Sequence, residues 1–192
     1  MKTILITGFD SFNGGGINPS WEAVKRLPDT LGDYMLCKLQ LPTLYRQAAE
    51  ILVKKAAEVH PDVIISVGQA GGRDAVTPER IAVNIRDARI ADNSGLILSG
   101  ERIAPLGPAA YFSTLPVEAM ATAIREAGIP ASVSNTAGAF VCNDVMYSLL
   151  HCYRDTSVRV GFIHVPYLPE QGSPNLPLED TVRALKAAVG VL

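Results

Sequence analysis

The stretch Ser134-Asn135-Thr136-Ala137-Gly138-Ala139-Phe140-Val141-Cys142-Asn143-Asp144-Val145-Met146-Tyr147 contains the features that decide the fold. Its pattern predicts the end of a buried strand at 129–134, a turn of small residues and the start of a helix that runs toward Tyr153. Cys142 would then lie in the first turns of that helix, where unpaired N–H groups and the helix dipole favour a thiolate. The same N–H groups could hold an oxyanion. The alternative is that Cys142 is a small apolar core residue.

Composition indicates one domain and excludes some partners. The 192 residues are 48% hydrophobic, which suffices for one substantial core, so we expect a single α/β domain over 1–192. Seventeen Lys and Arg against nineteen Asp and Glu give a net charge of −2 without a cationic run, so nucleic acid is not an expected partner. No uncharged apolar stretch matches a signal peptide or a membrane span, and we expect a cytoplasmic protein without a membrane partner.

Cysteine usage argues against a disulfide framework and against a metal site. Cys37, Cys142 and Cys152 are odd in number and lack CxxC or Cys/His metal spacing. We therefore expect free thiols, no metal and no organic cofactor. Cys37 and Cys152 are predicted to be buried core thiols.

Short apolar runs alternate with helical patterns along the chain. Strands are predicted at 3–7, 34–41, 63–68, 129–134 and 158–165 and beginning near Thr77, and helices at 19–27, 43–59, 116–127 and 178–189 besides the one at Cys142. Residues 89–111 are predicted to form a surface excursion with a short hairpin. This alternation predicts a three-layer α/β/α sandwich with a twisted, mostly parallel central sheet, similar to phosphorylases and hydrolases.

Ligands bind at the carboxyl edge of such sheets, and His164 ends a predicted strand at that edge. A thiol nucleophile needs an imidazole partner and usually a third group that orients it. His60 is predicted to cap a helix, and His151 lies more than two turns along the Cys142 helix, so His164 is the candidate partner. Glu79 is the candidate orienting acid. Equally, His164 could be a core histidine and Glu79 a solvated glutamate.

Four ordered blocks carry a resemblance to a known family. They are Gly8-Phe9-Asp10-Ser11-Phe12 through Asn18-Pro19-Ser20; Val67 to Arg73 with Pro78-Glu79-Arg80 and Asp87 to Asn93; Ser134 to Asn143; and Phe162-Ile163-His164-Val165-Pro166. Over essentially the whole chain the sequence resembles cysteine-type pyroglutamyl peptidases (pyrrolidone carboxyl peptidases). Ser11 stands where the family commonly has proline, and Gly14-Gly15-Gly16 replaces a more varied segment.

The resemblance implies a cysteine exopeptidase that removes N-terminal pyroglutamate from peptides through a thioester, with Glu79, Cys142 and His164 as its triad. It also suggests a homotetramer or a dimer. A pyroglutamyl ring needs apolar walls and groups that match its lactam. The candidate walls are Phe9, Phe12, Phe140 and Val141, the candidate polar contacts are Gln69 and Asn18, and Arg89 is a candidate for added positive charge at the oxyanion.

Each pocket assignment has an alternative. The aromatic residues could be core, and the amides could stabilise turns, as Asn18 would if it capped a helix. Two other functions also fit the fold. A phosphorylase or nucleosidase would hold phosphate in the turn 68–73, with Cys142 merely packed, and a non-catalytic module would bind a small amide.

Overall fold

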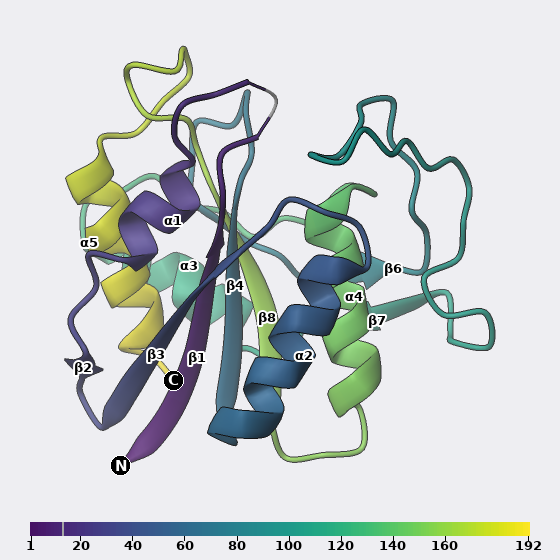
Figure 1. Cartoon of the computed structure of the whole chain (residues 1–192). Helices are drawn as coiled ribbons and strands as arrows, with labels where there is room; N and C mark the ends of the chain where they lie inside the picture. The colour runs from purple at the N-terminus through teal and green to yellow at the C-terminus, as the bar shows by residue number, and fades with distance from the viewer. Residues whose placement is uncertain (13) are drawn as a thin grey trace.

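A six-stranded sheet forms the centre of the molecule (Figure 1). The computed structural model describes residues 1–12 and 14–192. The strand order is β2-β3-β1-β4-β8-β5; the four inner strands run parallel, and the two-residue edge strands are antiparallel to their neighbours. The strands are β1 (Lys2–Phe9), β2 (Thr30–Leu31), β3 (Tyr34–Leu41), β4 (Val63–Gln69), β5 (Thr77–Pro78) and β8 (Arg159–Val165).

Helices cover both faces of this sheet. Figure 1 shows α1 (Pro19–Val24), α3 (Val117–Glu126) and α5 (Leu178–Val189) on one side and α2 (Gln47–Val59) and α4 (Val141–Tyr153) on the other. The two hydrophobic clusters follow the same division, since one unites residues of α1, α3 and α5 with the sheet and the other unites residues of α2 and α4 with it. The predicted three-layer α/β/α sandwich is confirmed.

The central strands are apolar on both faces because helices cover both. Along β1, Ile4 and Ile6 pack into the cluster of α1, α3 and α5, whereas Leu5 between them packs into the cluster of α2 and α4. All three side chains are fully buried. This explains why the inner strands appear in the sequence as continuous apolar runs without polar alternation.

The strand predicted at 129–134 is wrong. This segment makes only two isolated bridges, Val76 with Ala131 and Glu79 with Ser134. Pro78 and Pro130 lack the N–H groups that a continuous ladder would need. A loop therefore leads into α4, and it remains tied to the segment around Glu79.

The helix predicted from 43 begins only at Gln47. Arg46, directly before it, has a φ of 62°, which is not a helical value. Its backbone N–H is held at 2.7 Å by a carboxylate oxygen of Asp144 in α4. At the other end, His60 adopts the left-handed conformation and its N–H bonds to the carbonyl of Ala56, so the predicted helix-capping role of His60 is confirmed.

The long segment after β5 forms a separate antiparallel pair, β6 (Ile81–Val83) with β7 (Ala110–Phe112). Figure 1 shows the connection between them extending outward beyond α4. Within the described ranges, no helix combines the length and apolarity that crossing a bilayer requires.

Candidate active site

The candidate site lies at the carboxyl edge of the parallel strands. β1 is hydrogen-bonded to β3 on one side and to β4 on the other, so the chain changes its direction of winding beside β1. Phe9 ends β1 and Gln69 ends β4. In open α/β sheets the crevice at such a switch point is the usual place for a ligand.

Cys142 is the second residue of α4. The helix has no side-chain cap, and its first three N–H groups, those of residues 141–143, bond to no acceptor in the described residues. The sulfur lies directly over Gly68 of β4, where an added Cβ would be 2.9 Å from Sγ. The end of β4 thus carries the nucleophile candidate against the uncapped helix start.

His164 is brought to the same place by sheet register. It pairs with Gly68 across the parallel strands β4 and β8. Phe162, two residues earlier on the same face of β8, packs into the cluster of α2 and α4, and its ring lies 4.7 Å from the imidazole between centroids. The imidazole therefore faces the helix that carries Cys142. Among the described residues, no hydrogen bond joins Sγ to His164. Catalytic hydrogen bonds are often long or poorly aligned before substrate binds.

Glu79 completes the cluster. It follows β5, which pairs antiparallel with β8 so that Thr77 lies opposite His164. Glu79 Oε1 lies 2.7 Å from His164 Nδ1, and the carboxylate is fully buried. With Nδ1 held by the acid, Nε2 is the ring nitrogen free for proton transfer.

The pKa values show how the buried groups affect one another. Burial acts to raise the pKa of Glu79, but hydrogen bonds and charge from His164, Ser134 and Arg73 outweigh it, and the pKa is lowered. Burial lowers the pKa of His164, only partly opposed by Glu79. The acid is thus ionised and the imidazole neutral at neutral pH.

The expected stabilisation of a thiolate by the helix is not what dominates at Cys142. Burial, assisted by the charge of Glu79, raises the pKa of the thiol to about 12. Desolvation destabilises the thiolate here by more than the helix N-terminus stabilises it. The sulfur is therefore a thiol in the free protein.

A cavity of about 260 Å³ opens beside the sulfur. Five of the predicted pocket residues line it, together with Cys142. Phe12 and Phe140 are 5.2 Å apart between ring centroids, and Tyr45 packs edge-on against Phe140 at 5.3 Å. The residues that line the cavity are Phe9, Phe12, Asn18, Thr43, Gln69, Gly71, Ile90, Phe140, Cys142 and Tyr167.

Two predicted residues lie elsewhere. The Val141 side chain is fully buried in the core and does not line the cavity, because α4 turns it toward the sheet. Only its backbone N–H remains available at the helix start. Arg89 is exposed on the long segment before β7 and is not among the cavity residues, although its neighbour Ile90 is.

The two predicted amide side chains, those of Asn18 and Gln69, differ in which hydrogen-bonding groups remain without a partner among the described residues. Asn18 caps α1: its Oδ1 accepts from the Ser20 N–H at 3.1 Å, and its Nδ2 donates to the Asp10 carbonyl at 2.8 Å. Gln69 accepts one bond from Gln171 at 3.0 Å, and its own Nε2 has no partner in the described residues. Gln69 is therefore the better candidate for a ligand carbonyl, and Asn18 is chiefly structural.

The cavity contains residues that the sequence did not indicate. Tyr167 follows β8 closely and Thr43 follows β3, so both stand at the strand edge where the site was expected. That position could have revealed them. Ile90 reaches the cavity from a long irregular segment, for which no periodicity gives a signal.

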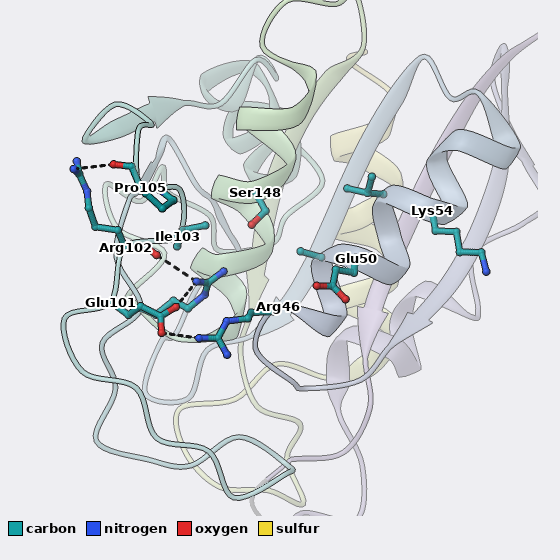
Figure 2. Close-up of a pocket in the computed structure, with 11 residues that line it drawn as sticks. Arg46, Glu50, Lys54, Glu101, Arg102, Ile103, Pro105 and Ser148 are labelled. Atoms are coloured by element: carbon teal, nitrogen blue, oxygen red, sulfur yellow. Dashed lines mark hydrogen bonds and ion pairs between the residues drawn. The ribbon is translucent and has the colours of Figure 1, made fainter.

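A larger cavity, of about 650 Å³, lies between α2, α4 and the segment 101–105 (Figure 2). Arg46 and Arg86 both pair with Glu101, at 2.6 and 2.7 Å. Arg86 also pairs at 2.8 Å with the buried Asp144, two residues after Cys142. These ion pairs anchor the first turn of α4 and contain none of the predicted site residues.

The other two cysteines depart from expectation. Cys152 is exposed near the end of α4, and Cys37 is half-buried in β3. The prediction of a buried core thiol is therefore wrong for Cys152, because α4 presents that position to solvent. Cys37 does pack against the hydrophobic cluster of α2 and α4, but it is only partly buried. In the described part of the chain, no three His, Cys, Asp or Glu side chains form a group that could hold a metal ion.

Gly68 gives a direct test of the site. A methyl group there would lie 2.7 Å from a Phe162 ring carbon and 2.9 Å from Sγ, both too close. A misplacement of a reacting group by about 1 Å can lower the reaction rate about 100-fold. We therefore expect Gly68→Ala to lower kcat/KM by about 100-fold. Steady-state kinetics with a coumarin amide of the substrate that the sequence resemblance implies measures this effect. Gly32→Ala, at an open β2–β3 turn, is the control for a glycine whose loss affects stability but not rate.

An α/β sandwich with a thiol, an imidazole and a buried acid at its strand edge defines a thiol hydrolase. Residues 2–192 match the family model for pyroglutamyl peptidase. The chain belongs to the pyroglutamyl peptidase family of cysteine peptidases.

Individual relatives agree. A pyrrolidone-carboxylate peptidase of Levilactobacillus brevis is 51% identical, covering 97% of this chain and 95% of its own length; one of Erwinia tasmaniensis is also 51% identical, covering 100% and 92%. The crystal structure of pyroglutamyl peptidase I from Bacillus amyloliquefaciens superposes with a TM-score of 0.95 at 45% identity, over 97% of this chain and 92% of that one. The phosphorylase alternative is thereby set aside.

Proposed function

We propose that this protein removes N-terminal pyroglutamate from peptides with Cys142 as nucleophile, His164 as general base and acid, and Glu79 as the orienting acid. The observation that carries the proposal is the buried chain of contacts from Glu79 through His164 to the strand position beneath the sulfur. Relatives that carry the name pyrrolidone-carboxylate peptidase support the choice of substrate.

Acylation follows from the protonation states. His164 Nε2 takes the proton of the Cys142 thiol as Sγ bonds to the pyroglutamyl carbonyl carbon. The oxyanion is held by the free N–H groups at the start of α4. The carbon–nitrogen bond then breaks, and the imidazolium returns its proton to the departing amine, which leaves a thioester.

In deacylation water is the nucleophile and Cys142 is the leaving group. His164 takes a proton from water, the hydroxide oxygen bonds to the thioester carbon, and Cys142 leaves with that proton. Glu79 stays ionised throughout and stabilises the imidazolium that forms in each step. A neutral thiol and a neutral imidazole in the free protein suit this cycle, because the base is ready to accept a proton.

The cavity suits the ring of the substrate. Its volume of about 260 Å³ lies below the range of about 300–1,000 Å³ that holds drug-sized ligands, so it fits a terminal ring and not a longer group. Phe9, Phe12 and Phe140 supply the apolar walls, and Gln69 Nε2 would donate to the lactam carbonyl. A cyclised terminus carries no ammonium, so the pocket needs no carboxylate. In this proposal Arg89 contributes only distant positive charge to the oxyanion.

Thiol alkylation tests the proposal. Because Cys152 is exposed, the experiment uses a Cys37→Ser/Cys152→Ser variant in which Cys142 alone remains. We expect iodoacetamide to abolish release of coumarin from the pyroglutamyl amide, and 5-oxoproline to slow that inactivation by occupying the cavity. Added phosphate should have no effect. An alkylated variant that keeps its activity, or an untreated one that never shows any, contradicts the proposal.

We further propose that the protein acts in the cytoplasm as a homotetramer or a dimer. The support is the family resemblance, together with free thiols that a reducing compartment would preserve. Light scattering coupled to gel filtration measures the assembly directly.

A further inference from the structure

Arg73 is a charged residue of the site to which the mechanism above gives no role. It follows β4 in a turn where Gly72 has a φ of +83°, a value that favours glycine. The turn directs the Arg73 side chain back toward β5, so that only 27% of it is exposed. The sequence places Arg73 at the end of a glycine-rich turn suited to phosphate, but the structure directs it to a carboxylate.

The guanidinium joins two parts of the site. Its Nη1 donates to Glu79 Oε1 at 2.6 Å and to Thr77 Oγ1 at 2.5 Å, and its Nη2 donates to the Thr136 carbonyl at 3.0 Å. Glu79 is the acid of the cluster, whereas Thr136 lies in the loop that leads into α4 and Cys142. One planar group with rigidly spaced donors thus spans both.

The same carboxylate oxygen serves two donors. Glu79 Oε1 accepts from Arg73 and lies 2.7 Å from His164 Nδ1. The charged or titratable groups that face this pair are Arg73 from the turn after β4, His164 from β8 and Cys142 from α4, with the Ser134 hydroxyl beside them. Burial is the largest influence on the pKa of each titratable group. Arg73 lowers the pKa of Glu79 through its hydrogen bond and the pKa of Cys142 and of His164 through its positive charge.

We propose that Arg73 is a positioning residue of this site: it fixes Glu79 against His164 and ties that acid to the loop that leads into the helix of Cys142. The inference rests on the proposed function. Arg73 does not line the cavity, so it acts through Glu79 and not through the substrate.

Arg73→Met tests the charge while it keeps the length of the side chain. Loss of the positive charge should raise the pKa of the Glu79–His164 pair, so the acid limb of the pH profile of kcat/KM should move to higher pH. We expect kcat at pH 7 to fall at least about tenfold, with a smaller change in KM because the cavity is untouched.

Two further variants separate charge from geometry. Arg73→Lys keeps the charge but cannot reach Glu79 and Thr136 together, so we expect its acid limb to match wild type while kcat recovers only in part. Arg26→Met is the control. It removes a half-exposed cation that pairs with Glu179 in the helical layer on the other side of the sheet, and it should leave kcat and the acid limb unchanged. Should Arg73→Met fail to fold, Arg73→Gln carries the test, since it also removes the charge.

The outcomes are distinct. An acid limb of Arg73→Met, or of Arg73→Gln in its place, that coincides with that of wild type overturns the positioning role, whatever the rate. A merely structural arginine changes the amount of active protein and not its proton affinity. Equal losses of kcat in Arg73→Met and Arg73→Lys with an unmoved acid limb also overturn it. A wild-type protein without pyroglutamyl cleavage overturns the proposed function instead.

Discussion

Cys142→Ser should lose turnover by about 10⁴-fold or more while it remains folded, as expected when the nucleophile of a triad is removed. A serine hydroxyl is a much weaker acid than a thiol, and burial already raises the pKa of the thiol to about 12, so His164 could not deprotonate the hydroxyl at a useful rate. The size change is small, and the sulfur lies at the wall of a cavity. Release of coumarin from the pyroglutamyl amide and the thermal unfolding midpoint measure the two effects.

Cys152→Ser is the matched control, because it makes the same substitution at an exposed position of the same helix. It should keep the activity and the unfolding midpoint of wild type. Turnover of Cys142→Ser within tenfold of wild type would remove Cys142 from the nucleophile role and leave it a packed residue beside a binding cavity.

Most of the layer architecture follows from the sequence because it depends on local patterns. The apolar runs at Val63–Gln69 and Arg159–Val165 favour strands buried on both faces, and the helix Leu178–Val189 begins and ends where its periodicity indicates. Residues at the carboxyl ends of those strands then had to share one edge. Gln69 and His164 were found in this way.

The remaining features depend on contacts between distant segments. The segment 129–134 has the composition of a strand, but its partner is a two-residue strand ending in Pro78, so only isolated bridges form. Arg46 takes its positive φ because a carboxylate 98 residues away, that of Asp144, holds its N–H. No local pattern contains either cause.

The chemistry of the cysteine shows the same limit. A position near a helix N-terminus predicts a thiolate, and Cys142 does occupy that position. What reverses the expectation is desolvation by its buried surroundings, close to the end of β4. Arg73 was hidden for a related reason, since its partners Glu79 and Thr136 meet only in the folded chain.

Glu79→Gln should lower kcat by about 10³- to 10⁴-fold, which is the scale for neutralising the acid of such a triad. In wild type the carboxylate accepts from His164 Nδ1 and opposes the imidazolium charge at 2.7 Å. Glutamine keeps the shape but removes the charge and leaves the Arg73 guanidinium without its anionic partner. Glu118→Gln, at an exposed glutamate paired with Arg80, is the matched control and should keep full activity.

The pH dependence of Glu79→Gln has a definite sign. The hydrogen bond and charge of Glu79 raise the pKa of His164, whereas burial and Arg73 lower it. Without the carboxylate only the lowering influences remain, so the acid limb of kcat/KM should move to lower pH, opposite to its shift in Arg73→Met. A rate within tenfold of wild type, or an acid limb that moves upward, would contradict the role of Glu79, because a charge that stabilises the imidazolium cannot be removed without making that cation harder to form.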